Sequence, residues 1–137
     1  MKVYLAGPLC TKVERENMEK IDEICKELGL RTFLPHRDCG LWKNMKDTKR
    51  IAEGDIKGFE ECGLLIANLN GFGISPGTAW EMGYAHAKGI PVIGIKTDKK
   101  IDKSIGEMSA IIVGSTKIVN SIPSLKKEIK ILIKRFG

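Results

Sequence analysis

The chain has 137 residues, of which 42% are hydrophobic and 29% charged, and these proportions suit a single soluble domain with a packed core, residues 1–137. The longest apolar run, GLLIA at residues 63–67, is far too short to span a bilayer, so we expect no membrane partner. The net charge of +6 gathers near the C-terminus without the interleaved aromatic residues of a nucleic-acid site, so we expect no nucleic-acid polymer as partner.

Cysteine spacing and the N-terminal residues indicate the compartment. The first residues, MKVYLAGPL, lack a long apolar stretch that ends in a cleavage site, so we expect no signal peptide and a cytoplasmic protein. The four cysteines form no CxxC pair and are expected to be reduced, with Cys25 in the core. A metal site formed by Cys10, His36, Asp38 and Cys39 stays an alternative, although their spacing matches no closed zinc pattern.

Segments with strand and helix patterns alternate along the chain. Hydrophobic runs predict strands and 3.6-residue periodicity predicts helices. The predicted strands are 2–6, 31–34, 64–69, 91–95 and either 111–113 or 117–119; the predicted helices are 12–28, 47–61, one starting between 75 and 78 and ending at Gly89, and one starting near Ser121 or Ser124. The helix over 47–61 is expected to turn Ile51, Ala52, Ile56 and Phe59 inward, and residues 97–107 are expected to form a mobile loop.

This order of elements predicts the fold and the place of the site. Strands that alternate with helices pair in parallel through right-handed crossovers. We therefore expect an α/β fold, a doubly wound, about five-stranded parallel sheet with flavodoxin-like order. Ligands of such sheets bind at the carboxyl ends of the strands, which here are followed by the loops 7–11, 35–40 and 70–78 and by the segment from Lys96 onward.

One carboxylate, Glu81, lies in the segment GTAWEMGYA with no Lys or Arg three or four residues away. Thr78-Ala79-Trp80-Glu81 fits a capping box, in which Glu81 would satisfy the first amides of the helix. Alternatively, Ser75 caps the helix and Pro76 occupies its first position, which places Glu81 too deep to act as a cap. The flanking Gly77 and Gly83 leave room for a ligand and favour a site.

Several segments together resemble the nucleoside 2-deoxyribosyltransferases. The resemblance runs from residue 2 to about residue 98, and the combination of YLAGP with GTAxExGYA and GIPVIG is specific. The segments that carry it are YLAGPL at 4–9, Thr11, Glu14-Arg15, LPHRD at 34–38, Asp55, GTAWEMGYA at 77–85 and GIPVIG at 89–94.

The resemblance implies a reaction and its residues. Glu81 would attack the anomeric carbon of a 2′-deoxyribonucleoside, and a second base or water would take the sugar from the resulting ester. Asp55 would hold the base or orient Glu81, although a solvated helix charge beside Lys57 is the alternative. The implied substrate-binding residues are Tyr4, Gly7, Pro8, Asp38, Ser75, Gly77 and Ser109, with His36 and Arg37 as further candidates near a base or a phosphate. No cofactor or metal is implied.

One departure from the family pattern leaves the substrate open. Transferases of the family often carry Asp six residues before the glutamate, where this chain has Ser75. Serine there, and the segment SAIIVG from Ser109, resemble the related 2′-deoxynucleoside 5′-monophosphate N-hydrolases, whereas Cys10 stands where those hydrolases have Arg. Family members assemble as homodimers or larger homo-oligomers, and the segment at Met108-Ser109 would complete a neighbour's site.

Three hypotheses follow for the function. The first is transfer of 2-deoxyribose between nucleobases, a reaction of nucleotide metabolism and purine salvage. The second is hydrolysis of a deoxynucleoside 5′-monophosphate, and the third is a non-catalytic nucleotide-binding domain in which Glu81 is only a cap.

Overall fold

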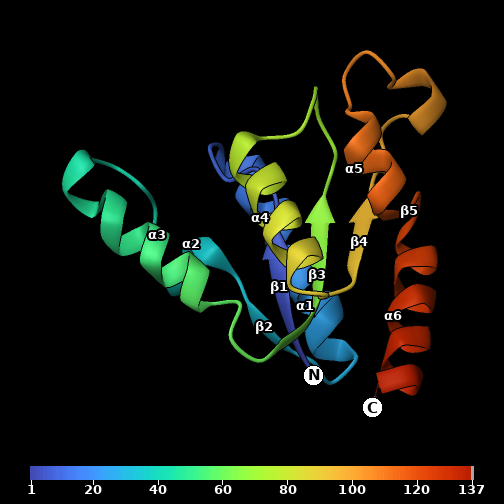
Figure 1. The fold of residues 1–137 in the computed structure, drawn as a ribbon, viewed down its shortest axis with the longest axis horizontal. Helices are drawn as coiled ribbons and strands as arrows, with labels where there is room; N and C mark the ends of the chain where they lie inside the picture. Colours follow the sequence, from blue (N-terminus) through green and yellow to red (C-terminus); the bar gives the residue numbers. More distant parts are fainter. Residues whose placement is uncertain (137) are drawn as a thin grey trace.

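The computed structural model describes residues 1–136, which form one parallel sheet with helices on both faces (Figure 1). The strands and helices follow one another in the predicted alternation. In chain order the elements are β1 (Lys2–Ala6), α1 (Lys12–Glu27), β2 (Arg31–Phe33), α2 (Pro35–Asp38), the 3-10 helix η1 (Met45–Asp47), α3 (Thr48–Lys57), β3 (Cys62–Asn68), α4 (Pro76–Ala87), β4 (Val92–Ile95), the 3-10 helix η2 (Ile101–Lys103), α5 (Ala110–Ser115), β5 (Lys117–Val119) and α6 (Ile122–Phe136).

The sheet has the strand order β2-β1-β3-β4-β5, and all four pairings are parallel. Leu5 lies opposite Ile66 and Ile66 lies opposite Ile93, so the central strands share one register. This order confirms the predicted α/β doubly wound fold of flavodoxin-like type. The chain runs from β1 outward to β2 and then returns to β3, so the switch point of the sheet lies between β1 and β3.

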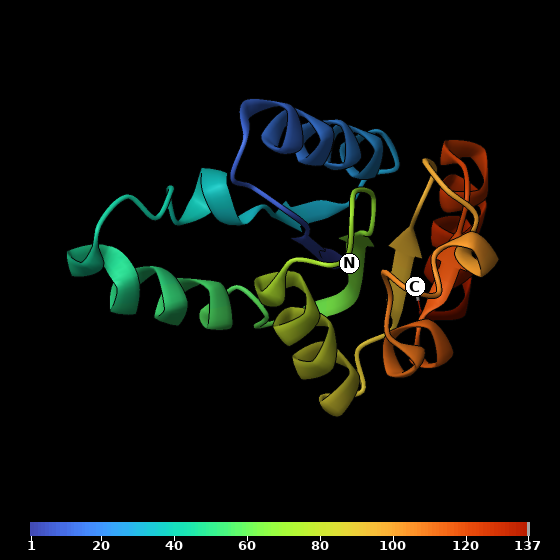
Figure 2. The same cartoon turned by 90° about the horizontal axis from the view of Figure 1, so that it is seen from above.

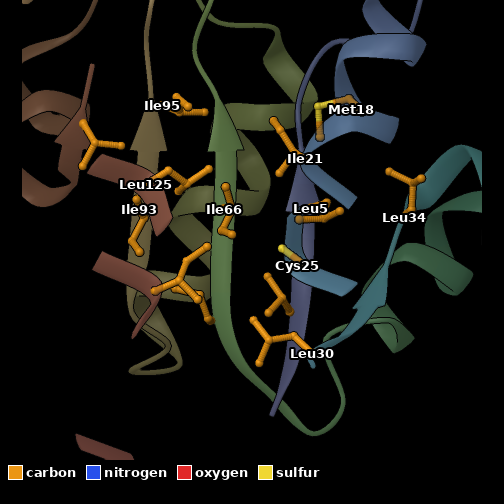
Figure 3. Packing of buried hydrophobic residues seen from close by; sticks show 14 residues of the cluster. Leu5, Met18, Ile21, Cys25, Leu30, Leu34, Ile66, Ile93, Ile95 and Leu125 are labelled. Carbon is orange, nitrogen blue, oxygen red and sulfur yellow. The ribbon is translucent and has the colours of Figure 1, made fainter. Parts of the chain in front are cut away.

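Both faces of the sheet are buried, because successive side chains of each strand point to opposite faces. Val3 and Leu5 pack with α1 and α6, whereas Tyr4 and Ala6 pack with α4. Figure 2 shows α1 and α6 on one side of the sheet and α4 and α5 on the other. Figure 3 shows the first layer, in which Leu5 and Ile66 of the sheet lie among Ile21, Cys25, Leu30 and Leu125.

Short sequence signals set the ends of the helices. Thr11 begins α1 with the capping box that its spacing to Glu14 allows: its hydroxyl accepts from the Glu14 amide at 3.1 Å, and its own amide donates to the Glu14 carboxylate at 2.9 Å. Gly29 ends the helix with a φ of +78°, which glycine adopts without a steric cost. Ser121 caps α6, since its hydroxyl accepts from the Ser124 amide at 3.2 Å.

The fifth strand and the third helix differ from parts of the prediction. Lys117–Val119 is the strand that pairs with β4, whereas residues 111–113 lie in α5, where Ile111 is exposed. The helix predicted over 47–61 spans Thr48–Lys57 and has no buried residue, so the expectation that Ile51, Ala52 and Ile56 enter the core is wrong. An apolar stripe predicts that a helix face is covered but not what covers it.

The loop after β4 is cross-linked to the loop after β3. Lys96 is buried, with 2% of the residue exposed, and its ammonium donates to the Leu69 carbonyl at 3.1 Å and to Asp98 at 2.9 Å. The Asn70 side chain accepts from the Thr97 amide at 2.7 Å. Farther along the segment expected to be mobile, residues 101–103 form η2, and Lys99 pairs with Glu107. Within residues 1–136, no helix is long and apolar enough to cross a membrane.

Replacement of Gly58 tests how tightly the aromatic layer behind β1 is packed. A Cβ at Gly58 would lie 2.6 Å from the ring of Phe33, which stacks on Tyr4. We expect Gly58→Ala to lower the free energy of unfolding by about 1–3 kcal/mol, measured by denaturant titration, because an overpacked ring must move. Gly106→Ala is the matched control, since a Cβ there meets nothing within 4 Å, and an equal loss in both variants would contradict this packing.

Candidate active site

A cavity of about 530 Å³ opens at the carboxyl ends of β1 and β3, beside the switch point of the sheet. Its walls come from the loop after β1, from Pro35 after β2, from α3 and from the start of α4. Its size is typical of a small-molecule site. Another hollow, of about 620 Å³, lies at the ends of β4 and β5 and holds none of the predicted site residues.

The start of α4 places Glu81 beyond the first turn. Ser75 is the N-cap, and its hydroxyl accepts from the Thr78 amide at 3.3 Å. Pro76 is the first helical residue and Glu81 the sixth, so the capping box from Thr78 does not form. Glu81 therefore caps nothing, and its half-buried carboxyl lines the cavity instead.

Tyr4 holds the carboxyl of Glu81. Its hydroxyl donates a hydrogen bond to Oε2 of Glu81, across 77 positions of sequence. The Tyr4 ring is fully buried and stacks on Phe59 with centroids 3.9 Å apart and planes 6° apart, so the hydroxyl has little freedom. Burial, followed by the charge of Glu81, raises the pKa of Tyr4 above its ordinary value, which keeps the hydroxyl a donor.

The Glu81 carboxyl titrates near neutrality. Burial raises its pKa to about 7; the Tyr4 hydrogen bond opposes this rise, and the charge of Asp55 adds to it. The helix dipole acts mainly within the first turn, which Glu81 has passed. Burial therefore dominates the pKa of Glu81, and the Tyr4 hydroxyl is the group that favours the charged form.

Asp55 reaches the same cavity from α3. Its side chain is half-buried, and among residues 1–136 no hydrogen-bond partner is present for Oδ1. Burial raises the pKa of Asp55, and a hydrogen bond from the Cys39 thiol opposes that rise. No ion pair with Lys57 is present in the described part of the chain. A half-buried carboxyl whose Oδ1 is inaccessible and has no hydrogen-bond partner in the described residues is not a solvated helix charge.

Five of the seven predicted substrate-binding residues line this cavity: Tyr4, Gly7, Pro8, Ser75 and Gly77. A Cβ at Gly7 would overlap the buried side chain of Met18, so a larger residue there would force that side chain to move. A Cβ at Gly77 would meet nothing within 4 Å, so space remains beside the helix.

Asp38 and Ser109 are not brought to the cavity. Asp38 accepts from the Leu34 amide at 2.9 Å and from Arg37 at 2.8 Å, which fixes the turn after β2. Arg37 also bonds the buried Asp22 at 3.1 Å, and His36 lies 3.1 Å from Glu19. Ser109 is exposed at the start of α5.

The metal alternative gains no support from the geometry. Cys10 lines the cavity, whereas Cys39 packs against α3, where a Cβ at Gly54 would lie 2.6 Å from its sulfur. Across residues 1–136, no group of three or more His, Cys, Asp or Glu side chains could hold a metal ion.

The sequence reasoning missed most of the apolar wall of the cavity. Leu9 and Pro35 lie in the loops predicted to contact a ligand, whereas the residues missed are Trp42, Ala52, Ile56, Phe59 and Trp80. The α3 residues among them carry a detectable signal, an apolar stripe on a helix beside a predicted site loop. Trp42 lies in a loop without a motif, and only the tertiary structure places it here.

Comparison with known proteins identifies the family. The family described as nucleoside 2-deoxyribosyltransferase matches residues 3–113, which is most of the chain. The chain belongs to the nucleoside 2-deoxyribosyltransferase family. An uncharacterized protein of Schizosaccharomyces pombe is 33% identical over 108 residues, which cover 72% of this chain and 51% of that protein. The chain thus spans about half the length of this curated relative.

Solved structures share the fold. A conserved protein of Enterococcus faecalis superposes with a TM-score of 0.73 at 29% identity, covering 95% of this chain and 97% of that one. The 2-deoxyribosyltransferase of Bacillus psychrosaccharolyticus gives 0.73 at 19% identity, covering 92% and 90%. The Leishmania mexicana enzyme gives 0.69 at 19% identity, covering 90% and 92%. At 19% identity, these two structures show that the chain shares their fold.

The raised pKa of Glu81 predicts a pH-dependent gain in stability when its charge is removed. A folded-state pKa of about 7 against an ordinary value of 4.5 means that the folded protein holds the proton more tightly. The wild type therefore loses stability as pH rises from about 4.5 to about 7. We expect Glu81→Gln, which keeps the shape and an acceptor for Tyr4, to be more stable than the wild type by a margin that is larger at pH 8 than at pH 5.

Thermal or denaturant unfolding of both proteins at the two pH values measures that margin. Glu23→Gln on the exposed side of α1 is the control, because a solvated carboxylate loses little on folding. A margin for Glu81→Gln that is constant between pH 5 and pH 8 would show that burial does not disfavour the Glu81 charge.

Proposed function

We propose that the protein transfers a 2-deoxyribosyl group between nucleobases, with Glu81 as the nucleophile. The observation that carries the proposal is the Glu81 carboxyl, which caps no helix, lines the cavity and is held by Tyr4. Burial disfavours the charged form of this carboxyl, and the Tyr4 hydrogen bond offsets that cost only in part. Family membership supports the same reaction class.

The reaction takes place in two displacements. The Glu81 carboxylate forms a bond to the anomeric carbon, the bond from that carbon to the base nitrogen breaks, and its electron pair leaves with the base. A deoxyribosyl ester of Glu81 remains, and an acceptor base reverses the step. A sugar without a 2′-hydroxyl forms the oxocarbenium-like transition state more readily, so one oriented carboxylate suffices.

We assign Asp55 to the base. Asp55 lines the cavity, where its carboxyl is placed to hydrogen-bond the base, and burial, which raises its pKa, favours the protonated form that can donate to the leaving nitrogen. Ser75 and Gly77 lie at the cavity edge, where the Ser75 hydroxyl and the Gly77 backbone suit the sugar hydroxyls.

The charge of the cavity favours a free nucleoside over a 5′-monophosphate. No Lys or Arg lines it within residues 1–136, and Cys10 stands in the first loop. A phosphate would rely on Ser75 and the start of α4, unless a second copy brings Ser109, which in this chain is exposed outside the cavity. Hydrolysis of a monophosphate is therefore the second candidate.

A single pair of incubations tests the proposal. The protein is mixed with deoxyinosine and adenine, and separately with dGMP, and bases and nucleosides are followed by chromatography. We expect deoxyadenosine from the first mixture, and its loss in Glu81→Ala with the fold retained by circular dichroism. If guanine is released from dGMP and no deoxyadenosine forms in the first mixture, the activity is hydrolysis instead. If neither mixture yields a product, the remaining hypothesis is a non-catalytic nucleotide-binding domain. Substantial residual turnover in Glu81→Ala would remove Glu81 as nucleophile.

The Tyr4 hydrogen bond predicts a shift in the pH profile. The nucleophile acts only as a carboxylate, so kcat/KM should rise with pH through about 7, the pKa of Glu81. Tyr4→Phe removes the group that lowers this pKa, so the acidic limb should move up by about one pH unit. Tyr84→Phe is the control, because Tyr84 stacks in the same aromatic layer but has no hydrogen bond to Glu81. Equal profiles for Tyr4→Phe and the wild type would argue against Glu81 as the titrating group.

A further inference from the structure

Both tryptophans of the chain line the cavity, and both are largely exposed to solvent. Trp42 is 63% exposed and Trp80 is 54% exposed, although large apolar rings usually lie inside. They come from separate elements: Trp42 precedes η1 in the loop that leads to α3, and Trp80 lies in α4, one residue before Glu81. Figures 1 and 2 both show α3 standing away from α4, and residues of both helices line the cavity.

The ring of Trp42 is oriented despite its exposure. Its indole N–H donates to the hydroxyl of Thr48, the first residue of α3, at 2.9 Å. A ring held in one orientation loses less entropy when a flat ligand stacks on it.

The ring of Trp80 ends a stack of four aromatic rings. Tyr4 stacks on Phe59 at 3.9 Å, Phe59 contacts Tyr84 at 4.7 Å, and Tyr84 stacks on Trp80 at 5.4 Å with planes 9° apart. Within residues 1–136, Tyr84 is the one aromatic neighbour of Trp80, so its other face is not covered by a ring. The stack supports Trp80 from behind and fixes it relative to the Tyr4 hydroxyl that holds Glu81.

We propose that Trp42 and Trp80 are the specificity-determining residues for the base and bind a planar heteroaromatic ring by stacking, with a preference for the bicyclic purines. Rings of nucleobases stack on aromatic side chains, and dispersion grows with the number of ring atoms in contact. The polar lining of the cavity near these rings is sparse, with Asp55 and Glu81 as its carboxyl residues. The stacking area therefore selects the type of base, and Asp55 determines which edge of the base faces it. Thr48 is a positioning residue that acts through Trp42. This inference rests on the proposed function, because it identifies the base acceptor of that site.

Intrinsic fluorescence gives a direct test, because the chain has no tryptophan outside the cavity. The probe is adenine, with cytosine as the monocyclic comparison, and Glu81→Gln serves as the parent so that no turnover occurs. Trp42→Leu in this parent leaves Trp80 as the reporter, and Trp80→Leu leaves Trp42. We expect adenine to quench each remaining tryptophan, adenine to bind more tightly than cytosine, and each substitution to weaken adenine binding about tenfold by calorimetry.

Matched variants separate stacking from a general loss of structure. Trp42→Phe should restore most of the affinity that Trp42→Leu loses, since it keeps a ring. Thr48→Val should weaken adenine binding about threefold, because the indole loses its hydrogen bond. Phe136→Leu removes an aromatic ring that is 59% exposed on α6, away from the cavity, and should leave the affinity unchanged.

Three outcomes would overturn the proposal: adenine affinities in Trp42→Leu and Trp80→Leu equal to that of the parent, equal binding of adenine and cytosine, or tryptophan emission that changes with protein concentration but not with adenine. The last would mean that a second copy covers the rings. The proposed function fails separately. Tryptophan-dependent adenine binding without deoxyadenosine formation by the wild type would support the stacking site and reject the transferase. Deoxyadenosine formation that is unchanged by Trp42→Leu and Trp80→Leu would support the transferase and reject the stacking site.

Discussion

The hydrogen bond from Tyr4 to Glu81 joins the centre of the sheet to the helix that borders the cavity. Its donor is fixed because β1 is buried on both faces and the Tyr4 ring lies against Phe59. Its acceptor is fixed because Ser75 and Pro76 set the start of α4 and hence the position of Glu81 along it. The remaining features of the site are arranged around a carboxyl that two rigid elements hold half out of water.

Burial gives that carboxyl its chemistry and weakens the fold around it. The same desolvation that raises the pKa of Glu81 to about 7 makes its charged form unfavourable, and Asp55 adds a second carboxyl whose pKa burial also raises. The helix that carries Asp55 has no buried residue, and its Ala52 and Ile56 face the cavity rather than the core. The fold is therefore less stable around the cavity than it would be if these apolar and acidic side chains were packed in the core or solvated.

The aromatic residues connect the hydrophobic core to the proposed chemistry. One run of rings begins under the sheet at Phe33, includes Tyr4 and Phe59, and emerges through Tyr84 at Trp80 beside the cavity. The inner rings orient the proposed nucleophile, and the outermost ring, with Trp42 from the loop ahead of α3, offers a flat surface to a base. A shift of any inner ring would therefore move both the carboxyl and the base surface.

The sequence by itself determined the alternation of strands and helices, the parallel sheet and the loops at its carboxyl edge, because these follow from local periodicity, caps and glycines such as Gly29. It also singled out Glu81 and Asp55, although it left the capping role of Glu81 open. Tertiary structure decided that Ser75 caps α4, that Tyr4 holds Glu81, that Asp38 is occupied by Leu34 and Arg37, and that Trp42 reaches the cavity. The Tyr4–Glu81 contact and the place of Trp42 depend on residues far apart in sequence, which local patterns do not encode. The contacts of Ser75 and Asp38 are local, and the folded chain selects them among competing local arrangements. Burial, which is also a tertiary property, is the largest cause of the raised Glu81 pKa.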